Sequence, residues 1–120
     1  MDELIARLVA NVGVDKATAA KAVGIILDFL HKEGPPDKVQ ALINSMPGAD
    51  ALLKAQQAES GGLFSMGGIM GAGTKLMGAG LSMGQVQAVT REVIGFGREK
   101  IGEDAIGEIV GAIPGLSQFI

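Results

Sequence analysis

Apolar residues recur along the whole chain at the spacing of an α-helix, three or four positions apart. The pattern opens near the N-terminus with one apolar face made of Leu4, Ile5, Leu8, Val9 and Val12. No stretch alternates between apolar and polar residues for long enough to indicate a strand. The pattern therefore predicts an all-α fold.

Glycine, proline and short polar residues divide this pattern into separate helices. Gly13 can end the first helix, and Asp15 is a plausible N-cap for a second helix that ends at Gly34. Pro36 and Asp37 suit the first turn of a third helix, because proline needs no amide partner there and a carboxylate meets the positive end of the helix dipole. The predicted inner face of the second helix consists of Ala19, Ala22, Val23, Ile26, Phe29 and Leu30.

Residues 13–53 match residues 80–120 without gaps, at a fixed offset of 67 positions. The identical pairs are Gly13 and Gly80, Phe29 and Phe96, Asp37 and Asp104, Pro47 and Pro114, and Gly48 and Gly115. Apolar positions match more completely, as in Ile26 with Val93, Leu27 with Ile94, Val39 with Ile106, Leu42 with Ile109 and Met46 with Ile113. We interpret this match as an internal duplication. The alternative is that two unrelated amphipathic hairpins match this well by chance.

The second half repeats the plan of the first. Ser82 is its N-cap candidate, Gly102 breaks the helix, and Glu103 and Asp104 begin the next one. We therefore expect an all-α bundle of about six helices, built from two duplicated helical hairpins joined by a Gly/Met-rich segment. The expected single domain covers residues 1–120, with a first helical half at 1–58, the Gly/Met-rich segment at 59–81 and a second helical half at 82–120.

The Gly/Met-rich region is the unusual part of the sequence. Residues 61–84 contain nine glycines and a single charge, Lys75. Glycine disfavours a helix interior by about 1 kcal/mol relative to alanine, so the segment needs a packing partner. If it were helical from Met66, its bulky residues would share one face. The candidate interaction residues are Met66, Ile69, Met70, Leu76, Met77 and Met83, together with Phe119 near the C-terminus, which needs burial under the bundle or in a partner.

Three interpretations of this segment remain open. It can thread between the two helical halves, with methionines filling gaps in the core. It can form a self-association surface in which methionines from two chains meet. It can also lie on or in a bilayer, where spacings such as Gly67 to Gly71 permit close helix contact. A spanning helix is the weakest form of the third interpretation, because Lys75 would lie near its middle at a cost of about 3 kcal/mol.

Composition narrows the classes of function. Of 120 residues, 48% are apolar and 19% are charged, so a core can form; it must be aliphatic, because the only aromatic residues are four Phe. The net charge of −3 and the lack of Trp and Tyr argue against nucleic-acid binding. Without cysteine there is neither a disulfide nor thiolate chemistry. The acidic start, Asp2 and Glu3, is unlike a secretory signal, and we expect a cytoplasmic protein.

The sequence offers no catalytic constellation. His31 is the only histidine, and its place near the end of a predicted helix suits a cation at the negative end of the dipole. The serines lack a nucleophile motif. The acids of the second half, Glu99, Glu103, Asp104 and Glu108, are typical of a solvated helix face rather than of a cation site. We predict a protein that is not an enzyme and that has neither a cofactor nor a metal site.

Several segments resemble a known family. Gly13-Val14-Asp15 before an Ala-rich helix, Val39-Gln40-Ala41-Leu42 leading to Met46-Pro47-Gly48-Ala49-Asp50-Ala51-Leu52-Leu53, and the glycine-rich middle are similar to the VcgC/VcgE group of small bacterial proteins of unknown function. The resemblance covers roughly residues 4 to 113. It implies an all-helical protein without an established activity, so it transfers no site residue to this chain.

These observations together favour a non-enzymatic interaction or structural module that self-associates, most simply as a dimer. The uncharged stretches at residues 60–74, 76–90 and 109–120 offer more apolar surface than so short a chain can easily bury. A peripheral membrane protein that uses the Gly/Met-rich segment is the first alternative. A binder of small apolar ligands is the second.

Overall fold

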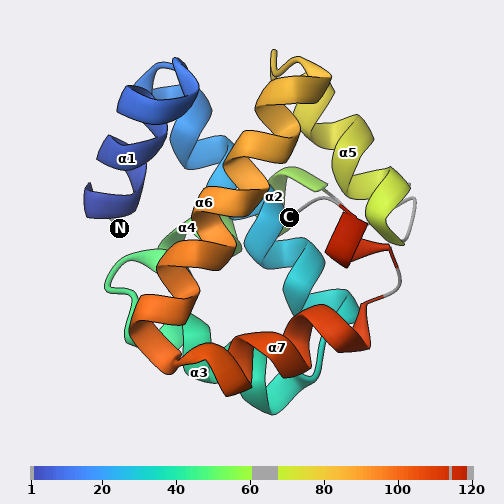
Figure 1. Cartoon of the computed structure of the whole chain (residues 1–120). Helices are drawn as coiled ribbons and strands as arrows, with labels where there is room; N and C mark the ends of the chain where they lie inside the picture. Colours follow the sequence, from blue (N-terminus) through green and yellow to red (C-terminus); the bar gives the residue numbers. More distant parts are fainter. Residues whose placement is uncertain (1, 61–67, 114, 119–120) are drawn as a thin grey trace.

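The computed structural model is helical, as the periodicity predicts, over the residues that it describes: 2–60, 68–113 and 115–118, with the backbone alone at 57–60 and 68–70 (Figure 1). The elements in chain order are α1 (Asp2–Val12), α2 (Lys16–Glu33), α3 (Pro36–Ser45), α4 (Ala49–Ser60), α5 (Gly68–Gly78), α6 (Met83–Ile101), α7 (Glu103–Ala112) and the 3-10 turn η1 (Leu116–Gln118). The described residues thus form seven α-helices, where the sequence predicts about six. The additional helix is α5, in the segment for which helix and loop both remain open.

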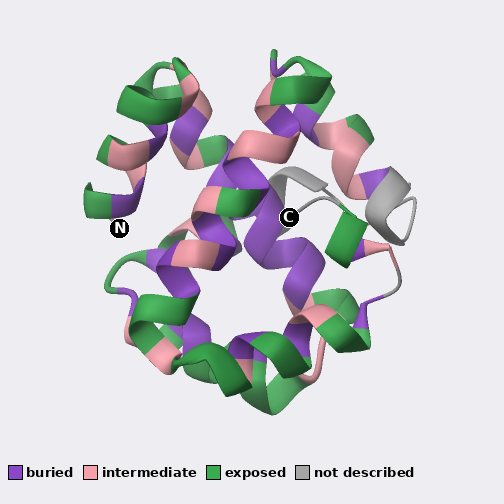
Figure 2. Ribbon diagram, viewed as in Figure 1, coloured by how far each residue is buried: buried purple, intermediate pink, exposed green. Residues whose placement is uncertain are grey.

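Helix α2 lies at the centre of the bundle. All nine residues from Ala22 to Leu30 are buried, so this stretch is covered on every side (Figure 2). Its neighbours are α1, α3, α4, α5 and α6. A helix that is apolar all round is stable only when other helices surround it, which explains why the apolar run Ile25–Leu27 continues around the helix instead of following one face.

The predicted caps of the two long helices are confirmed. Asp15 precedes α2 and accepts a hydrogen bond from the Thr18 backbone N–H at 2.7 Å. Ser82 precedes α6 and forms a reciprocal capping box with Gln85. Each cap satisfies backbone N–H groups that have no partner within the helix, so the local sequence alone is sufficient to place both helix starts.

Helix boundaries recur at the spacing that relates the two segments of the sequence. Helix α3 covers residues 36–45 and α7 covers residues 103–112. The glycines of the four turns, Gly13, Gly48, Gly80 and Gly115, all have a positive φ, between 83° and 106°. Paired apolar positions are buried together, as in Ala22 with Val89, Ile26 with Val93, Leu27 with Ile94, Phe29 with Phe96, Val39 with Ile106, Leu42 with Ile109 and Met46 with Ile113.

The packing of the helices is reciprocal between the two parts of the chain. Helix α1 packs against α6, and α5 packs against α2. The central helices α2 and α6 contact each other, as do α3 and α7. The first helix of each part therefore bridges to the long helix of the other part, and this exchange holds the two parts in one core (Figure 1).

Candidate interaction surface

A tight turn at the surface of the bundle joins α5 to α6. We call this turn, together with the helix ends on either side of it, the corner. The Leu81 N–H donates to the Leu76 carbonyl at 3.3 Å, and the Gly80 N–H donates to the Met77 carbonyl at 3.0 Å. This pair of bonds is the Schellman motif, and it requires a left-handed residue, which Gly80 supplies with φ of 106°. Leu76 and Leu81 are the positions that make hydrophobic contact in this motif, and both are buried.

The start of α6 fixes the other side of the corner. The Ser82 N–H donates to Gln85 Oε1 at 2.9 Å, and the Gln85 N–H donates to Ser82 Oγ at 3.2 Å. Leu81 and Val86 stand at the two positions of a hydrophobic staple, and both belong to the core. The backbone of the corner is therefore held by four hydrogen bonds and by buried leucine and valine side chains.

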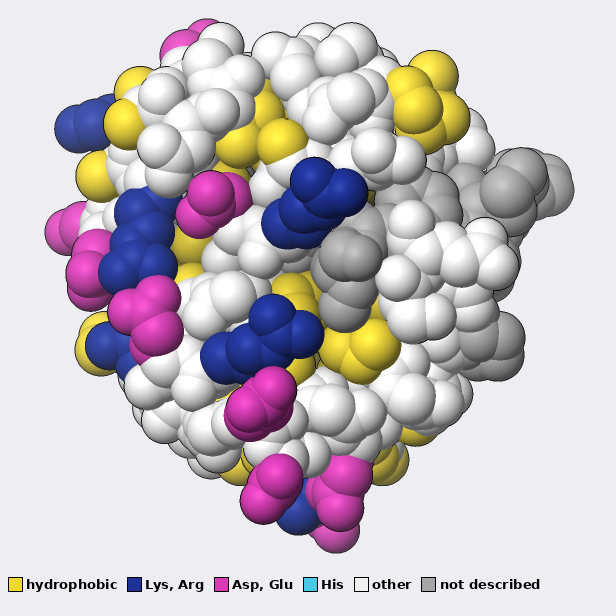
Figure 3. Space-filling model, in the orientation of Figure 1, with side chains coloured by type: hydrophobic (Ala, Val, Ile, Leu, Met, Phe, Trp, Pro, Cys, Tyr) yellow, Lys and Arg dark blue, Asp and Glu magenta, His cyan; other side chains and the backbone are white. Residues whose placement is uncertain are grey.

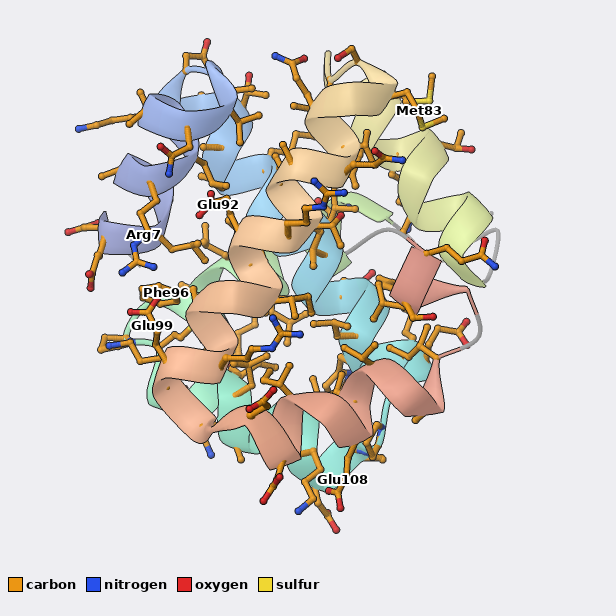
Figure 4. All side chains as sticks on the ribbon, viewed as in Figure 1. Arg7, Met83, Glu92, Phe96, Glu99 and Glu108 are labelled. Carbon is orange, nitrogen blue, oxygen red and sulfur yellow. The ribbon has the colours of Figure 1, made fainter. Side chains whose placement is uncertain are left out.

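Two methionines project from this corner into solvent. Met77 in the last turn of α5 is 48% exposed, and Met83 at the first position of α6 is 54% exposed. Figure 4 shows the Met83 side chain pointing away from the helices, and Figure 3 shows an apolar protrusion in the same part of the molecule. Among the described side chains, the remaining large apolar residue with substantial exposure is Val9 on α1, at 37%.

The sequence around the two methionines is rich in glycine and lacks charge from residue 76 to residue 90. A Cβ added at Gly78, Gly80 or Gly84 would meet nothing within 4 Å, and all three glycines are exposed. Residues 76–90 contain no charged side chain, and the nearest charge before them is Lys75. We define the corner surface by its five residues: Met77, Gly78, Gly80, Met83 and Gly84.

The turn between α1 and α2, 67 residues earlier in the sequence, carries different side chains. Gly13 has φ of 83° and is followed by the N-cap Asp15, so the backbone turns in the same way. The positions 67 residues before Met77 and Met83 are Ala10 and Lys16, and both are exposed. A short side chain and a charged one are therefore compatible with this turn. A turn of this backbone conformation does not by itself require methionine at positions 77 and 83.

The predicted interaction residues separate into three groups. Met77 and Met83 are exposed, as an interaction surface requires. Leu76 is a correction, because it is 2% exposed and packs in the core beside Leu81. The apolar pattern places Leu76 and Met77 on one broad face of a helix, but successive residues are about 100° apart, and in α5 Leu76 faces the core while Met77 faces solvent. Met66, Phe119 and the side chains of Ile69 and Met70 lie outside the described residues.

A small apolar cavity lies between α2, α5 and α6, with Leu116 of η1 also at its wall. Its volume is about 20 Å³. This is enough for about one water molecule and is far below the roughly 300–1,000 Å³ of common ligand sites. The Thr90 hydroxyl at its wall already donates to the Val86 carbonyl at 2.8 Å. Two wider grooves run along Ala17 and Ala20 of α2, but they are open to solvent.

The sequence pattern does not predict the burial of Asp28. It lies in the middle of α2 and is 2% exposed. Its Oδ2 atom pairs with Lys32 Nζ at 3.1 Å, whereas its Oδ1 atom is buried without a hydrogen-bond partner. A charge inside the run Ile25–Leu30 is the signal that could have marked it, because carboxylates are rarely fully buried. Its equivalent position in α6 is Gly95, so the second half has no counterpart to this charge.

The described residues do not contain a group of three or more His, Asp or Glu side chains arranged to hold a metal ion. Within the same part of the chain, none of the helices combines the length and the apolar character needed to cross a membrane. Comparisons with models of protein families, with curated proteins and with solved structures find no match to this chain. The interpretation of the corner surface therefore depends on its own geometry.

Proposed function

We propose that this chain is a non-enzymatic interaction module, built from two duplicated helical hairpins, that self-associates as a dimer through the corner surface. The observation that carries the proposal is the pair of exposed methionines, Met77 and Met83, on a rigid, uncharged corner. The equivalent corner of the first hairpin has Ala10 and Lys16 instead. If the two hairpins arose by duplication, the apolar residues found at the second corner alone form a surface that the fold itself does not need.

The duplication draws its support from the recurrence of helix ends. The caps at Asp15 and Ser82 and the positive-φ glycines at Gly48 and Gly115 are each separated by 67 residues. Local propensity could produce one such agreement by chance. The agreement of caps, turns and buried positions together favours a common origin of the two hairpins.

The physical chemistry of the corner surface favours a second copy of the same chain as its partner. Full burial of a methionine side chain contributes about 1.5–3 kcal/mol, and a two-fold interface would bury Met77 and Met83 from both chains. The exposed glycine backbones allow the two surfaces to approach closely. Because residues 76–90 carry no charge, contact between identical surfaces brings no like charges together within that stretch and desolvates none there.

The proposal is tested by placing lysine at the methionine positions. We expect Met77→Lys/Met83→Lys to weaken dimerisation at least tenfold, since Met83→Lys reproduces the side chain that the first corner carries at Lys16. Val9→Lys is the control for the effect of a surface lysine as such, because it puts one positive charge on the exposed apolar residue of α1, where the double variant carries two on the corner surface. Light scattering coupled to size-exclusion chromatography measures the mass of each variant. Equal dimerisation by all three proteins would contradict the assignment of the corner surface.

Binding to a membrane surface is the competing use of the same methionines. Flotation with liposomes separates the two functions, because a soluble dimer remains in the dense fraction whether or not vesicles are present. If the wild-type chain floats with vesicles and Met77→Lys/Met83→Lys does not, the corner surface is a membrane contact and the proposal is wrong.

A further inference from the structure

The methionines with described side chains differ strongly in their access to solvent. Met46 at the end of α3 is 1% exposed and belongs to the core, whereas Met77 and Met83 are about half exposed. Thioether sulfur is oxidised by peroxides at a rate that follows its exposure. The fold therefore contains two accessible thioethers on the corner surface and a shielded one as an internal reference.

We infer that Met77 and Met83 form an oxidation site at which peroxide controls self-association; this inference rests on the proposed function. In the reaction the thioether sulfur attacks one oxygen of hydrogen peroxide, the O–O bond breaks, and the departing hydroxide takes up the remaining proton to give water. Sulfur loses two electrons and becomes a sulfoxide, and the peroxide is reduced. The products are methionine sulfoxide and water, and methionine sulfoxide reductases reverse the change.

Oxidation changes the property on which the proposed interface depends. A sulfoxide is polar and a strong hydrogen-bond acceptor, so burying it against a second copy leaves its oxygen without a donor. Four backbone N–H groups of the corner are not free to bond that oxygen. The Gly80 and Leu81 N–H groups already bond to the Met77 and Leu76 carbonyls, and the Ser82 and Gln85 N–H groups are used in the capping box. Oxidised chains are therefore expected to dissociate.

Association should in turn slow the oxidation of the two sulfurs. A thioether buried against a second copy of the chain is less accessible to peroxide. A dilute, monomeric sample should then be oxidised faster at the corner than a concentrated, dimeric one. The shielded Met46 should be insensitive to concentration.

The positions of the basic residues allow both sites to be measured in one digest. Trypsin cleavage after Lys75 and Arg91 releases residues 76–91, which contain Met77 and Met83 as their only methionines. Cleavage after Lys38 and Lys54 releases residues 39–54, which contain Met46 alone. In a dilute, monomeric sample of the folded chain treated with hydrogen peroxide, we expect sulfoxide to accumulate at least tenfold faster in peptide 76–91 than in peptide 39–54. In denaturant, where all sulfurs are exposed, the difference should disappear. Similar rates in the folded chain would overturn the inference.

The effect on association is measured by light scattering before and after oxidation, and again after repair by methionine sulfoxide reductases. Loss of the dimer on oxidation and its return on repair support the inference. Met77→Leu/Met83→Leu is the matched variant, because it keeps the apolar surface but has no sulfur there. It should dimerise, and peroxide should not dissociate its dimer. A wild-type dimer that survives full oxidation of peptide 76–91 overturns this inference alone. A chain that is monomeric before oxidation overturns both this inference and the proposed function.

Discussion

The guanidinium of Arg7 on α1 lies 5.0 Å from the centre of the Phe96 ring on α6 and donates hydrogen bonds to both carboxylate oxygens of Glu99. Lys100 places a second cation 5.1 Å from the same ring. A cation over an aromatic face and a two-pronged pair with a carboxylate both fix orientation as well as distance. Arg7 therefore ties the first helix of the chain to the long helix of the second half.

The Arg7–Glu99 pair predicts a dependence of stability on acid. The Arg7 hydrogen bonds are the main reason why the pKa of Glu99 lies below its ordinary value of 4.5. Because this pKa is lower in the folded chain, the stabilisation is present above about pH 4.5 and is lost as the pH falls through the folded value. We expect Glu99→Gln to lower the urea midpoint at neutral pH and to make little difference in strong acid. A Glu99→Gln effect that is the same at both pH values would contradict this account.

The turn between α5 and α6 predicts opposite effects for two neighbouring glycines. Gly80→Ala places a side chain at φ of 106° and should cost about 1–2 kcal/mol, the penalty for a left-handed conformation. Gly78→Ala lies in the helix, meets nothing within 4 Å and should be neutral or stabilising by up to about 1 kcal/mol. Thermal unfolding of both variants measures the difference. Equal midpoints would show that the turn does not need a left-handed residue.

Gly97 and Gly95 on α6 should also respond in opposite directions to substitution by alanine, because Gly97 is tightly packed and Gly95 is not. An added Cβ at Gly97 would lie 2.7 Å from Ile106 Cδ1 and 3.0 Å from Leu42 Cδ1, so α3 and α7 approach α6 closely there. Gly97→Ala forces those side chains to move, at a cost of about 1–3 kcal/mol that its better helix propensity only partly offsets. Gly95→Ala has open space and should stabilise by about 0.5–1 kcal/mol. If denaturant unfolding shows Gly97→Ala to be more stable than Gly95→Ala, the close approach of α3 and α7 to α6 is refuted.

The pair of buried Asp28 and exposed Lys32 predicts a strongly non-additive mutant cycle. Lys32→Ala leaves a buried carboxylate without its cation and should cost about 1–3 kcal/mol, less than for a fully buried pair because Lys32 is half exposed. Asp28→Leu removes the charge and its unpartnered Oδ1 atom, so it should be neutral or stabilising. In the Asp28→Leu background, Lys32→Ala should have almost no effect. Additive free energies of unfolding would show that the pair does not interact.

The local features of the fold could be predicted from the sequence because they depend on few residues. Asp15 and Ser82 are followed by apolar helical patterns, and a cap needs only a side-chain oxygen and the N–H groups next to it. Gly102, with φ of 91°, ends α6 where the pattern breaks. These positions need no information about the rest of the chain.

The candidate surface could be predicted only in part. Several glycines near Leu76 can each end a helix, and the choice of Gly80 depends on the burial of both Leu76 and Leu81 under the bundle. Periodicity groups Leu76 and Met77 on one broad face, since they are only about 100° apart around the helix, and it cannot decide which of the two faces the bundle. Asp28 was missed for a related reason: its burial follows from helices that cover α2 on every side, and one-sided periodicity does not describe such a helix.

Sedimentation equilibrium of the untreated wild-type chain tests the central claim most directly. The self-association of the corner surface predicts that the apparent mass rises from 12.2 kDa toward twice that value as the concentration increases into the high micromolar range. The Met77→Lys/Met83→Lys variant should stay at the monomer mass under the same conditions. A wild-type chain that remains monomeric at high micromolar concentration would contradict the claim.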